Sequence, residues 1–317
     1  MSAPPQDQAA AVPDPFNSAA EKVTRWLGDN TPIRQWSVSR VTAGQQVHLH
    51  VSGDGPMNVG DTLDWVETLC RRMVLGAPHV VPDIRVDPNY ADLDLARKGD
   101  IAAYAGIMIG DENGELFGVL CGVDERPLTS PDAIDSTLLE LMSALLSDVL
   151  ITSRAHLQAN ETAVRARSEA DNDALTGLLN RRGWDRLAET LHVRHRSFGD
   201  PYSVLVVDLD QLKEVNDNAG HAAGDELLRT AARTLRRTVR GTDALARLGG
   251  DEFCLLLVDC VGAQAEARVA DLRRNLAAVG VAASIGVSTA GPLDELADTL
   301  AAADASMYDD KRRQQLV

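Results

Sequence analysis

The chain has 317 residues, and 44% of them are hydrophobic, which is enough for two ordinary domains with separate cores. Its 31 Lys and Arg residues stand against 47 Asp and Glu residues, so the net charge is -16. This charge is a poor electrostatic match for DNA, RNA or an anionic membrane, and we expect none of them as a partner. An anionic phosphate ligand would have to be held by a metal ion or by a few local bases.

The cysteines and the N-terminal segment indicate a reducing compartment. The four cysteines lack CxxC spacing and two lie in apolar runs, which favours buried free thiols over disulfides or a zinc site. Residues 1–16 lack the basic start and apolar stretch of a secretory signal, and their Pro, Ala and Gln content predicts disorder. No apolar run approaches the roughly 20 residues of a membrane span. We therefore expect a cytoplasmic protein.

Residues 17–153 predict a first α+β domain, an antiparallel sheet with helices on one face. Alternating apolar and polar residues indicate the strands, and apolar residues three or four apart indicate the helices. In chain order we expect a helix at 21–27, a strand at 46–52, a helix at 61–74 and a strand pair at 101–109 and 116–124.

A long helix is expected next, with Ser130 as its N-cap. Its apolar residues recur at steps of four and three, which indicates either a partner helix or packing on the sheet of the same domain: Leu138, Met142, Leu145 and Val149. Residues 154–172 are polar almost all round and predict a solvated connector or the exposed part of a short coiled coil.

Residues 173–317 predict a second domain with the element order β-α-β-β-α-β, which is the ferredoxin-like arrangement. In that topology the first and third strands are antiparallel neighbours. The end of the first strand, Asp208-Leu-Asp210, therefore meets the start of the third, Asp251-Glu252, behind two glycines.

Carboxylates that converge in this way repel each other unless a cation neutralises them, and oxygen ligands suit Mg²⁺ or Mn²⁺. A metal pair at this edge would serve phosphoryl-type chemistry. The structural alternative is that the acids only cap and solubilise a hairpin.

The segment Gly249-Gly-Asp-Glu-Phe253 resembles the signature of the GGDEF diguanylate cyclases, which condense two GTP into cyclic di-GMP and release pyrophosphate. Three more stretches are family-like and in the family's order: DALTGLLNRR, DLDQLKEVNDNAGHAAGDELL and SIGVS. The resemblance covers residues 173–311 and implies a palm-type domain of ferredoxin-like fold.

The resemblance implies a metal site and a reaction centre. The expected metal ligands are Asp208, the carbonyl of Leu209, Asp251 and Glu252, with Mg²⁺ or Mn²⁺ as the cofactor. The expected catalytic residues are Glu252, Asp251 and Lys213; Glu252 would assist metal binding or deprotonation of the 3′-hydroxyl.

The resemblance also implies substrate contacts. Asn216 and Asp225 match the positions that bind the guanine edge, and a carboxylate suits guanine's adjacent N–H donors, so GTP is favoured over another nucleotide. Gly249 and Gly250 would leave room for the substrate, and Lys311, like Lys213, would face the phosphates.

Arg240-Gly-Thr-Asp243 stands where the family carries its RxxD product-inhibition site, so Arg240 and Asp243 are expected to bind cyclic di-GMP; a surface pair at a helix end is the alternative.

Two departures from the family pattern matter. Leu212 replaces a usual Phe, and Asp310 and Gln315 stand where the family often has Ala and a phosphate-binding Arg. Triphosphate binding could therefore be weakened, unless a neighbouring arginine compensates.

The first domain resembles a GAF domain through its last two strands, their Asp-Glu-Asn-Gly turn and the Arg-Pro that follows. This resemblance implies a sensor for an unknown small ligand or a redox signal. Cys70 and Cys121 occupy apolar positions that indicate core packing, with a redox role as the alternative. The histidines are expected in core or surface roles rather than as haem or metal ligands: His48, His50 and His79.

The family's reaction needs two GTP-loaded domains face to face, so the resemblance implies a homodimer whose long helix sets the alignment of the two sites. The alternative function is a catalytically weak nucleotide-binding signalling or interaction module.

Overall fold

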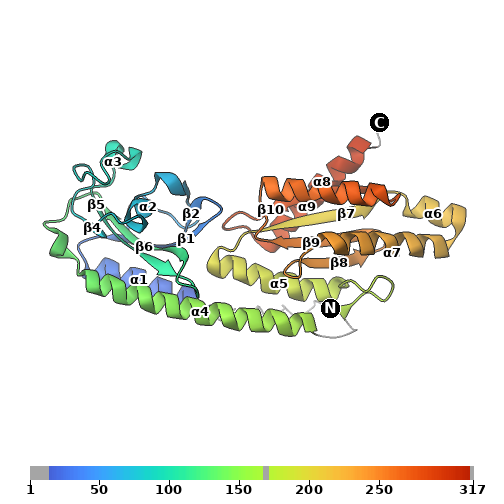
Figure 1. Ribbon diagram of the computed structural model, residues 1–317, viewed down its shortest axis with the longest axis horizontal. Helices are drawn as coiled ribbons and strands as arrows, with labels where there is room; N and C mark the ends of the chain where they lie inside the picture. The colour runs from blue at the N-terminus through green and yellow to red at the C-terminus, as the bar shows by residue number, and fades with distance from the viewer. Residues whose placement is uncertain (1–13, 167–170, 315–317) are drawn as a thin grey trace, which may run out of the picture. The chain divides into compact units, whose positions relative to one another are not determined.

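The computed structural model describes residues 14–166 and 171–314, which form two compact units that divide between His156 and Leu157 (Figure 1). Most of the N-terminal segment that we expected to be disordered lies outside the described residues. Its last two residues belong to helix α1 (Pro15–Asn30). Phe16 is fully buried there and packs edge-on against Phe117, with 5.7 Å between ring centroids.

The first unit is built on a six-stranded antiparallel sheet with the strand order β3-β2-β1-β6-β5-β4. The strands are β1 (Gln35–Thr42), β2 (Gln45–Ser52), β3 (Thr62–Asp64), β4 (Val80–Val81), β5 (Ala103–Gly110) and β6 (Leu116–Asp124). The predicted strand pair corresponds to β5 and β6, whereas β1 was not predicted. β1 contains serine and arginine among its apolar residues, so its sequence does not show a clear strand pattern. Its strand conformation is stabilised by pairing with β6.

The prediction of a helix at residues 61–74 is largely wrong. Its first residues form β3, paired with β2, and then the short helix η1 (Trp65–Glu67). Only α2 (Leu69–Val74) is α-helical, because Thr68 caps it by accepting a hydrogen bond from the Arg71 N–H.

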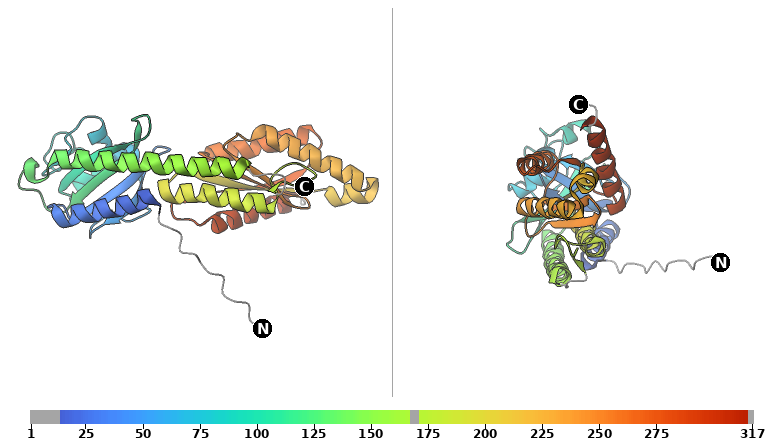
Figure 2. Two further views of the ribbon diagram at one scale, coloured as in Figure 1. Left: turned by 90° about the horizontal axis from the view of Figure 1, so that it is seen from below. Right: turned by 90° about the vertical axis from the view of Figure 1, so that its right-hand side faces the viewer.

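Helices lie on both faces of this sheet rather than on one. α1 and α4 (Ser136–Ala166) lie side by side over one face (Figures 1 and 2). α2 and α3 (Asp94–Lys98) belong to the opposite side, where α2 packs with residues of β5 and β6 in one buried cluster.

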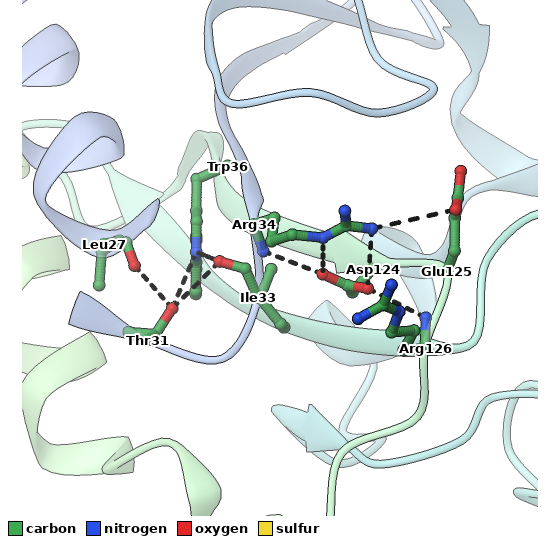
Figure 3. Close-up of polar contacts among 8 residues, drawn as sticks. All are labelled: Leu27, Thr31, Ile33, Arg34, Trp36, Asp124, Glu125 and Arg126. Carbon is green, nitrogen blue, oxygen red and sulfur yellow. Dashed lines mark hydrogen bonds and ion pairs between the residues drawn. The ribbon is translucent and has the colours of Figure 1, made fainter. Parts of the chain in front are cut away.

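The connection from α1 to β1 is fixed by a buried carboxylate at the end of β6 (Figure 3). Asp124 accepts hydrogen bonds from Arg34 N and Arg34 Nε, both at 3.1 Å, and from Arg126 N at 3.0 Å. Burial raises the pKa of Asp124, but these donors outweigh burial and leave the pKa below its usual value. Beside this carboxylate, the indole N–H of Trp36 donates to the carbonyl of Ile33.

The helix α4 carries two apolar stripes. Leu139, Leu146 and Leu150 are buried, and Ser143 donates a hydrogen bond to the carbonyl of Met108 in β5, so one stripe packs on the sheet. The predicted stripe lies beside it and is half exposed, as the exposed fraction of 50% at Leu145 shows. Ser130 caps the short helix η2 (Pro131–Ala133) instead of α4.

By length and composition alone, one segment among the described residues, Ser136–Ala163 of α4, is apolar enough to cross a membrane. No such run was expected from the sequence. The signal is weak, because a helix that packs on the core of a soluble domain passes the same test, and one stripe of α4 packs in that way.

The second unit confirms the ferredoxin-like prediction: its sheet has the strand order β10-β7-β9-β8, and all neighbours are antiparallel. The strands are β7 (Tyr202–Leu209), β8 (Ala244–Gly249), β9 (Glu252–Val258) and β10 (Ala283–Thr289). The helices are α5 (Arg181–Phe198), α6 (Leu212–Ala219), α7 (His221–Thr238), α8 (Ala263–Ala278) and α9 (Leu296–Gln314).

Each face of this sheet has its own core. Leu205, Val207 and Phe253 pack with α7 and α8 in one cluster, whereas Val204 and Cys254 pack with α5 and α9 in the other. Successive residues of a strand point to opposite faces, so β7 and β9 are held on both sides.

Gly286 allows α9 to approach β10 closely. A Cβ atom at this position would lie 2.1 Å from Met307 N and 2.2 Å from the Ala303 carbonyl oxygen. We expect Gly286→Ala to lower the free energy of unfolding of this unit by about 1–3 kcal/mol, because backbone atoms cannot move aside as a side chain does. Urea unfolding of the full chain measures the change.

The matched control is Gly241→Ala, since no atom lies within 4 Å of the Cβ position there. This variant should stay within about 0.5 kcal/mol of the unsubstituted protein. Equal stability of the two variants would contradict the close approach of α9.

Candidate active site

The predicted acids meet at the paired ends of β7 and β9. Asp208 stands directly opposite Glu252, and the Leu209 N–H donates to the Asp251 carbonyl at 3.2 Å. The turn between β8 and β9 is tight, and Gly249 pairs with Glu252 across it. The structure therefore brings together two pairs of expected metal ligands, 208–209 and 251–252, which lie 43 positions apart in the sequence.

Asp208 is buried, with 8% of its surface exposed, whereas Glu252 is exposed at the start of its strand. Lys311, from α9, donates to Asp208 Oδ1 at 2.6 Å. This contact raises the pKa of Lys311. Burial raises the pKa of Asp208, and its acidic neighbours Asp251 and Asp210 add to the rise, so that the lysine offsets it only in part.

Asp210 has an unmet oxygen. Its Oδ1 accepts a hydrogen bond from Ser284 at 2.7 Å, whereas its Oδ2 is buried and accepts none from the residues that the structure describes. A buried, unpaired carboxylate oxygen beside Asp208 is costly unless a cation approaches it. Sequence reasoning had noted Asp210 without giving it a role.

The donor set fits a hard divalent cation. Carboxylate and carbonyl oxygens are what Mg²⁺ prefers, and one or two carboxylates with substrate phosphates commonly complete its shell. Among residues 14–166 and 171–314, no three carboxylate, imidazole or thiol side chains converge closely enough to hold a metal by themselves. The residues present thus fit a metal that arrives with phosphate oxygens.

The two positions expected to bind guanine lie at the junction of α6 and α7. A Cβ atom on Gly224 would lie 2.1 Å from Asn216 Oδ1, so the missing side chain of Gly224 lets Asn216 lie against α7. Asp225, the next residue, is half-buried beside this contact, with Arg229 3.7 Å from its carboxylate. Gly224 was not among the predicted site residues, although the Gly-Asp pair in the first part of an amphipathic helix was a signal.

Lys213 lies in the first turn of α6 and is exposed. Among the described residues, no hydrogen bond or ion pair ties its ammonium group to the acids at the end of β7, so its expected role in catalysis stays a prediction.

Arg247 connects the glycine turn to the start of the second unit. Its guanidinium donates to the Gly250 carbonyl at 2.8 and 3.0 Å and to Asp173 at 3.2 and 3.3 Å. Asp173 also accepts from the backbone and hydroxyl of Thr176. The DALTGLLNRR motif is thereby tied to the turn that carries Gly249, a connection that sequence reasoning did not find.

An open pocket of about 500 Å³ lies beside this connection. Its lining includes both glycines of the turn and three arginines: Gly249, Gly250, Arg181, Arg182 and Arg247. With three arginines and one aspartate, Asp173, the lining carries a net positive charge.

The two residues of the expected product site differ in environment. Asp243 is buried, and its carboxylate accepts from the backbone N–H groups of Arg240, at 2.7 Å, and Val258, at 3.2 Å. Arg240 is exposed. Asp243 thus holds the turn between α7 and β8, while the guanidinium of Arg240 faces solvent.

Asp310, a departure from the family pattern, anchors α9. Its carboxylate accepts from Ile285 N at 3.0 Å, Arg273 at 2.8 Å and Gln314 at 3.0 Å. Burial raises the pKa of Asp310, but these donors outweigh burial and lower it. The other departure, Gln315, lies outside the described residues.

Comparison with family models matches both units. Residues 170–316 match the model "Diguanylate cyclase, GGDEF domain", and residues 16–150 match the GAF domain model.

Three curated proteins illustrate the likeness. Diguanylate cyclase DgcM of Escherichia coli K12 is 38% identical over 118 residues, 37% of this chain and 27% of DgcM. Diguanylate cyclase DgcP of the same strain is 26% identical over 264 residues, 80% of this chain and 76% of DgcP. An uncharacterized 19.3 kDa protein of Streptomyces ambofaciens is 37% identical over 184 residues, 56% of this chain and 92% of that protein. The chain spans about a quarter of the length of DgcM.

These matches establish the class. The chain belongs to the GGDEF diguanylate cyclase family and carries a GAF domain ahead of its GGDEF domain.

Proposed function

We propose that the protein is a diguanylate cyclase that condenses two GTP into cyclic di-GMP with release of two pyrophosphates. The observation that carries the proposal is the pairing of Asp208 with Glu252 at the ends of two antiparallel strands, next to the Gly249-Gly250 turn. We further propose a sensor domain over residues 17–153, a helical linker over 154–172, and a catalytic domain over 173–317.

Each catalytic domain would bind one GTP. Asn216 and Asp225, adjacent at the junction of α6 and α7, would take the guanine edge through amide and carboxylate hydrogen bonds. Lys213 and Lys311 would face the phosphates. Lys311 would leave Asp208 for this purpose, because an arriving cation would take over the neutralisation of that carboxylate.

Mg²⁺ or Mn²⁺ would be held by Asp208, the Leu209 carbonyl, Asp251 and Glu252. When bound, such an ion supplies charge neutralisation at the phosphates and lowers the pKa of the attacking hydroxyl. Glu252 is exposed and therefore free to accept the 3′-hydroxyl proton, while Asp251 and the buried Asp208 would serve as ligands of the ion.

Two catalytic domains must face each other, because each supplies one GTP to a product that contains two. The half-exposed stripe of α4 supports a homodimer: Leu145 in this stripe is 50% exposed, and the neighbouring Leu141 is 55% exposed. A second copy of α4 would cover these residues. A ligand that changes the packing of this helix would change how often the two sites align.

Buried free thiols and a nucleoside triphosphate substrate both favour a cytoplasmic location.

We expect purified protein to convert GTP and Mg²⁺ to cyclic di-GMP and pyrophosphate, and Glu252→Gln to lower the rate by about two orders of magnitude or more. Glu266→Gln, an exposed substitution on α8, is the control and should leave the rate unchanged. Chromatography of the products measures both rates. If the unsubstituted protein binds GTP without making product at concentrations that give dimers, the nucleotide-binding module is the better description.

We expect a four-residue insertion after Gln158, in the exposed part of α4, to change the cyclase rate several-fold, because it rotates the following residues relative to the stripe. A seven-residue insertion at the same place restores the heptad register and should retain more of the original rate. Identical rates for both insertions and the unsubstituted protein would remove the helix from the regulation.

We expect added cyclic di-GMP to slow the reaction, and Arg240→Ala to relieve this inhibition at least about tenfold, because its exposed guanidinium is available to pair with phosphate. The inhibition constant measures the effect. Arg237→Ala, an exposed change in the last turn of α7, is the control. Unchanged inhibition in Arg240→Ala would remove the product site.

A further inference from the structure

A small cavity of about 120 Å³ lies on the α2 side of the GAF-domain sheet. Cys70 of α2 and Cys121 of β6 both line it, together with Gln46, His48 and Tyr104. The cavity is also lined by Pro56, which is exposed, and by Leu63, which is 36% exposed, so its rim reaches solvent. The two thiols themselves are 4% and 2% exposed.

The two cysteines line the same cavity and belong to the same buried cluster. Gln46 Nε2 donates to Cys70 Sγ at 3.4 Å, and the hydroxyl of Tyr104 faces the same sulfur. Tyr104 Oη is fully buried and makes no conventional hydrogen bond. A sulfur atom thus has polar donors around it, an arrangement that a purely apolar core does not provide.

This environment favours a thiolate at Cys70. The thiol of Cys121 and then the other donors lower the pKa of Cys70, against the effect of burial. Cys121 has the opposite shift: its role as donor to Cys70, and its burial, raise its pKa. The two shifts have opposite directions, so Cys70 is the more acidic thiol of the pair and Cys121 is placed to act as its resolving partner.

The other two cysteines provide a comparison within the chain. Cys254 is fully buried in β9, and burial raises its pKa. Burial likewise raises the pKa of Cys260. Neither residue lines the cavity that holds Cys70 and Cys121.

We propose that Cys70 and Cys121 form a peroxide-sensitive site that closes reversibly into a disulfide. Hydrogen peroxide, which is close to water in size, can enter the cavity. The Cys70 thiolate attacks one peroxide oxygen, the O–O bond breaks, and hydroxide leaves as water after taking a proton. Cys121 then attacks the sulfenic sulfur of Cys70, and the S–O bond breaks with release of a second water. Two thiols supply the two electrons that reduce one peroxide to two waters, and an added dithiol reverses the reaction.

This inference does not rest on the cyclase activity, so its test has a chemical readout. The reduced full-length protein is treated with hydrogen peroxide, alkylated and digested without reductant. We expect mass spectrometry to detect a peptide pair joined through Cys70 and Cys121, and dithiothreitol to separate it. We expect Cys70 to be lost at least about tenfold faster than Cys254, because the thiolate is the reacting species.

Variants separate the roles of the two sulfurs. Cys121→Ser should leave a sulfenic acid on Cys70 that dimedone captures, whereas Cys70→Ser should give no such adduct on Cys121. Tyr104→Phe, which removes one donor and keeps the ring, should slow the loss of Cys70. Cys254→Ser should oxidise like the unsubstituted protein.

The measurement on the unsubstituted protein decides the matter even if a variant fails to fold. Loss of Cys70 and Cys254 at the same rate, in protein whose circular dichroism shows that it is folded, would overturn the proposal. Oxidation of Cys70 without any joined peptide would also overturn it.

Discussion

The antiparallel pairing of β7 with β9 is the constraint on which the site depends. The pairing sets Asp208 opposite Glu252, so acids from two separate segments share one edge of the sheet. A shift of the register by a single residue would turn every side chain of one strand to the wrong face. The relative positions of the acids therefore depend on the two hydrophobic cores that pack against β7 and β9 from either side.

The position of the helix α9 determines which positive charge lies next to Asp208. Gly286 lets α9 lie against β10, and the buried carboxylate of Asp310 ties the helix to the backbone of Ile285. The residue that follows, Lys311, then reaches Asp208. Asp310, which stands where the family often has Ala, thus helps to position the lysine that we expect to face the phosphates.

Patterns that repeat along the chain made much of the fold predictable. The order of strands and helices in the second unit was sufficient for its topology, because few topologies satisfy that order. The last two strands of the first unit were also predictable, since an Asn-Gly turn separates two apolar runs. β1 was missed because its polar residues interrupt the apolar pattern and it is paired to β6, which is distant in sequence. β3 was missed because it has three residues, all exposed, which give no apolar alternation.

The site was predictable where motif and topology agree, as for Asp208 and Glu252. Contacts that join distant elements were not. Arg247 spans from Asp173 to Gly250, and Tyr104 faces Cys70, through side-chain directions that no spacing rule gives. Gly224 is an intermediate case. The Gly-Asp motif can be recognised in the sequence, but the closeness of Asn216 to Gly224 is seen only in the folded structure.

Diffraction from crystals grown with a non-hydrolysable GTP analogue and Mn²⁺ would test the central claim most directly. The account predicts an anomalous manganese signal in coordinating contact with Asp208 and Asp251, with Lys311 moved from Asp208 toward the phosphates. Nucleotide bound elsewhere, with the contact between Lys311 and Asp208 intact and no manganese at this edge of the sheet, would contradict it.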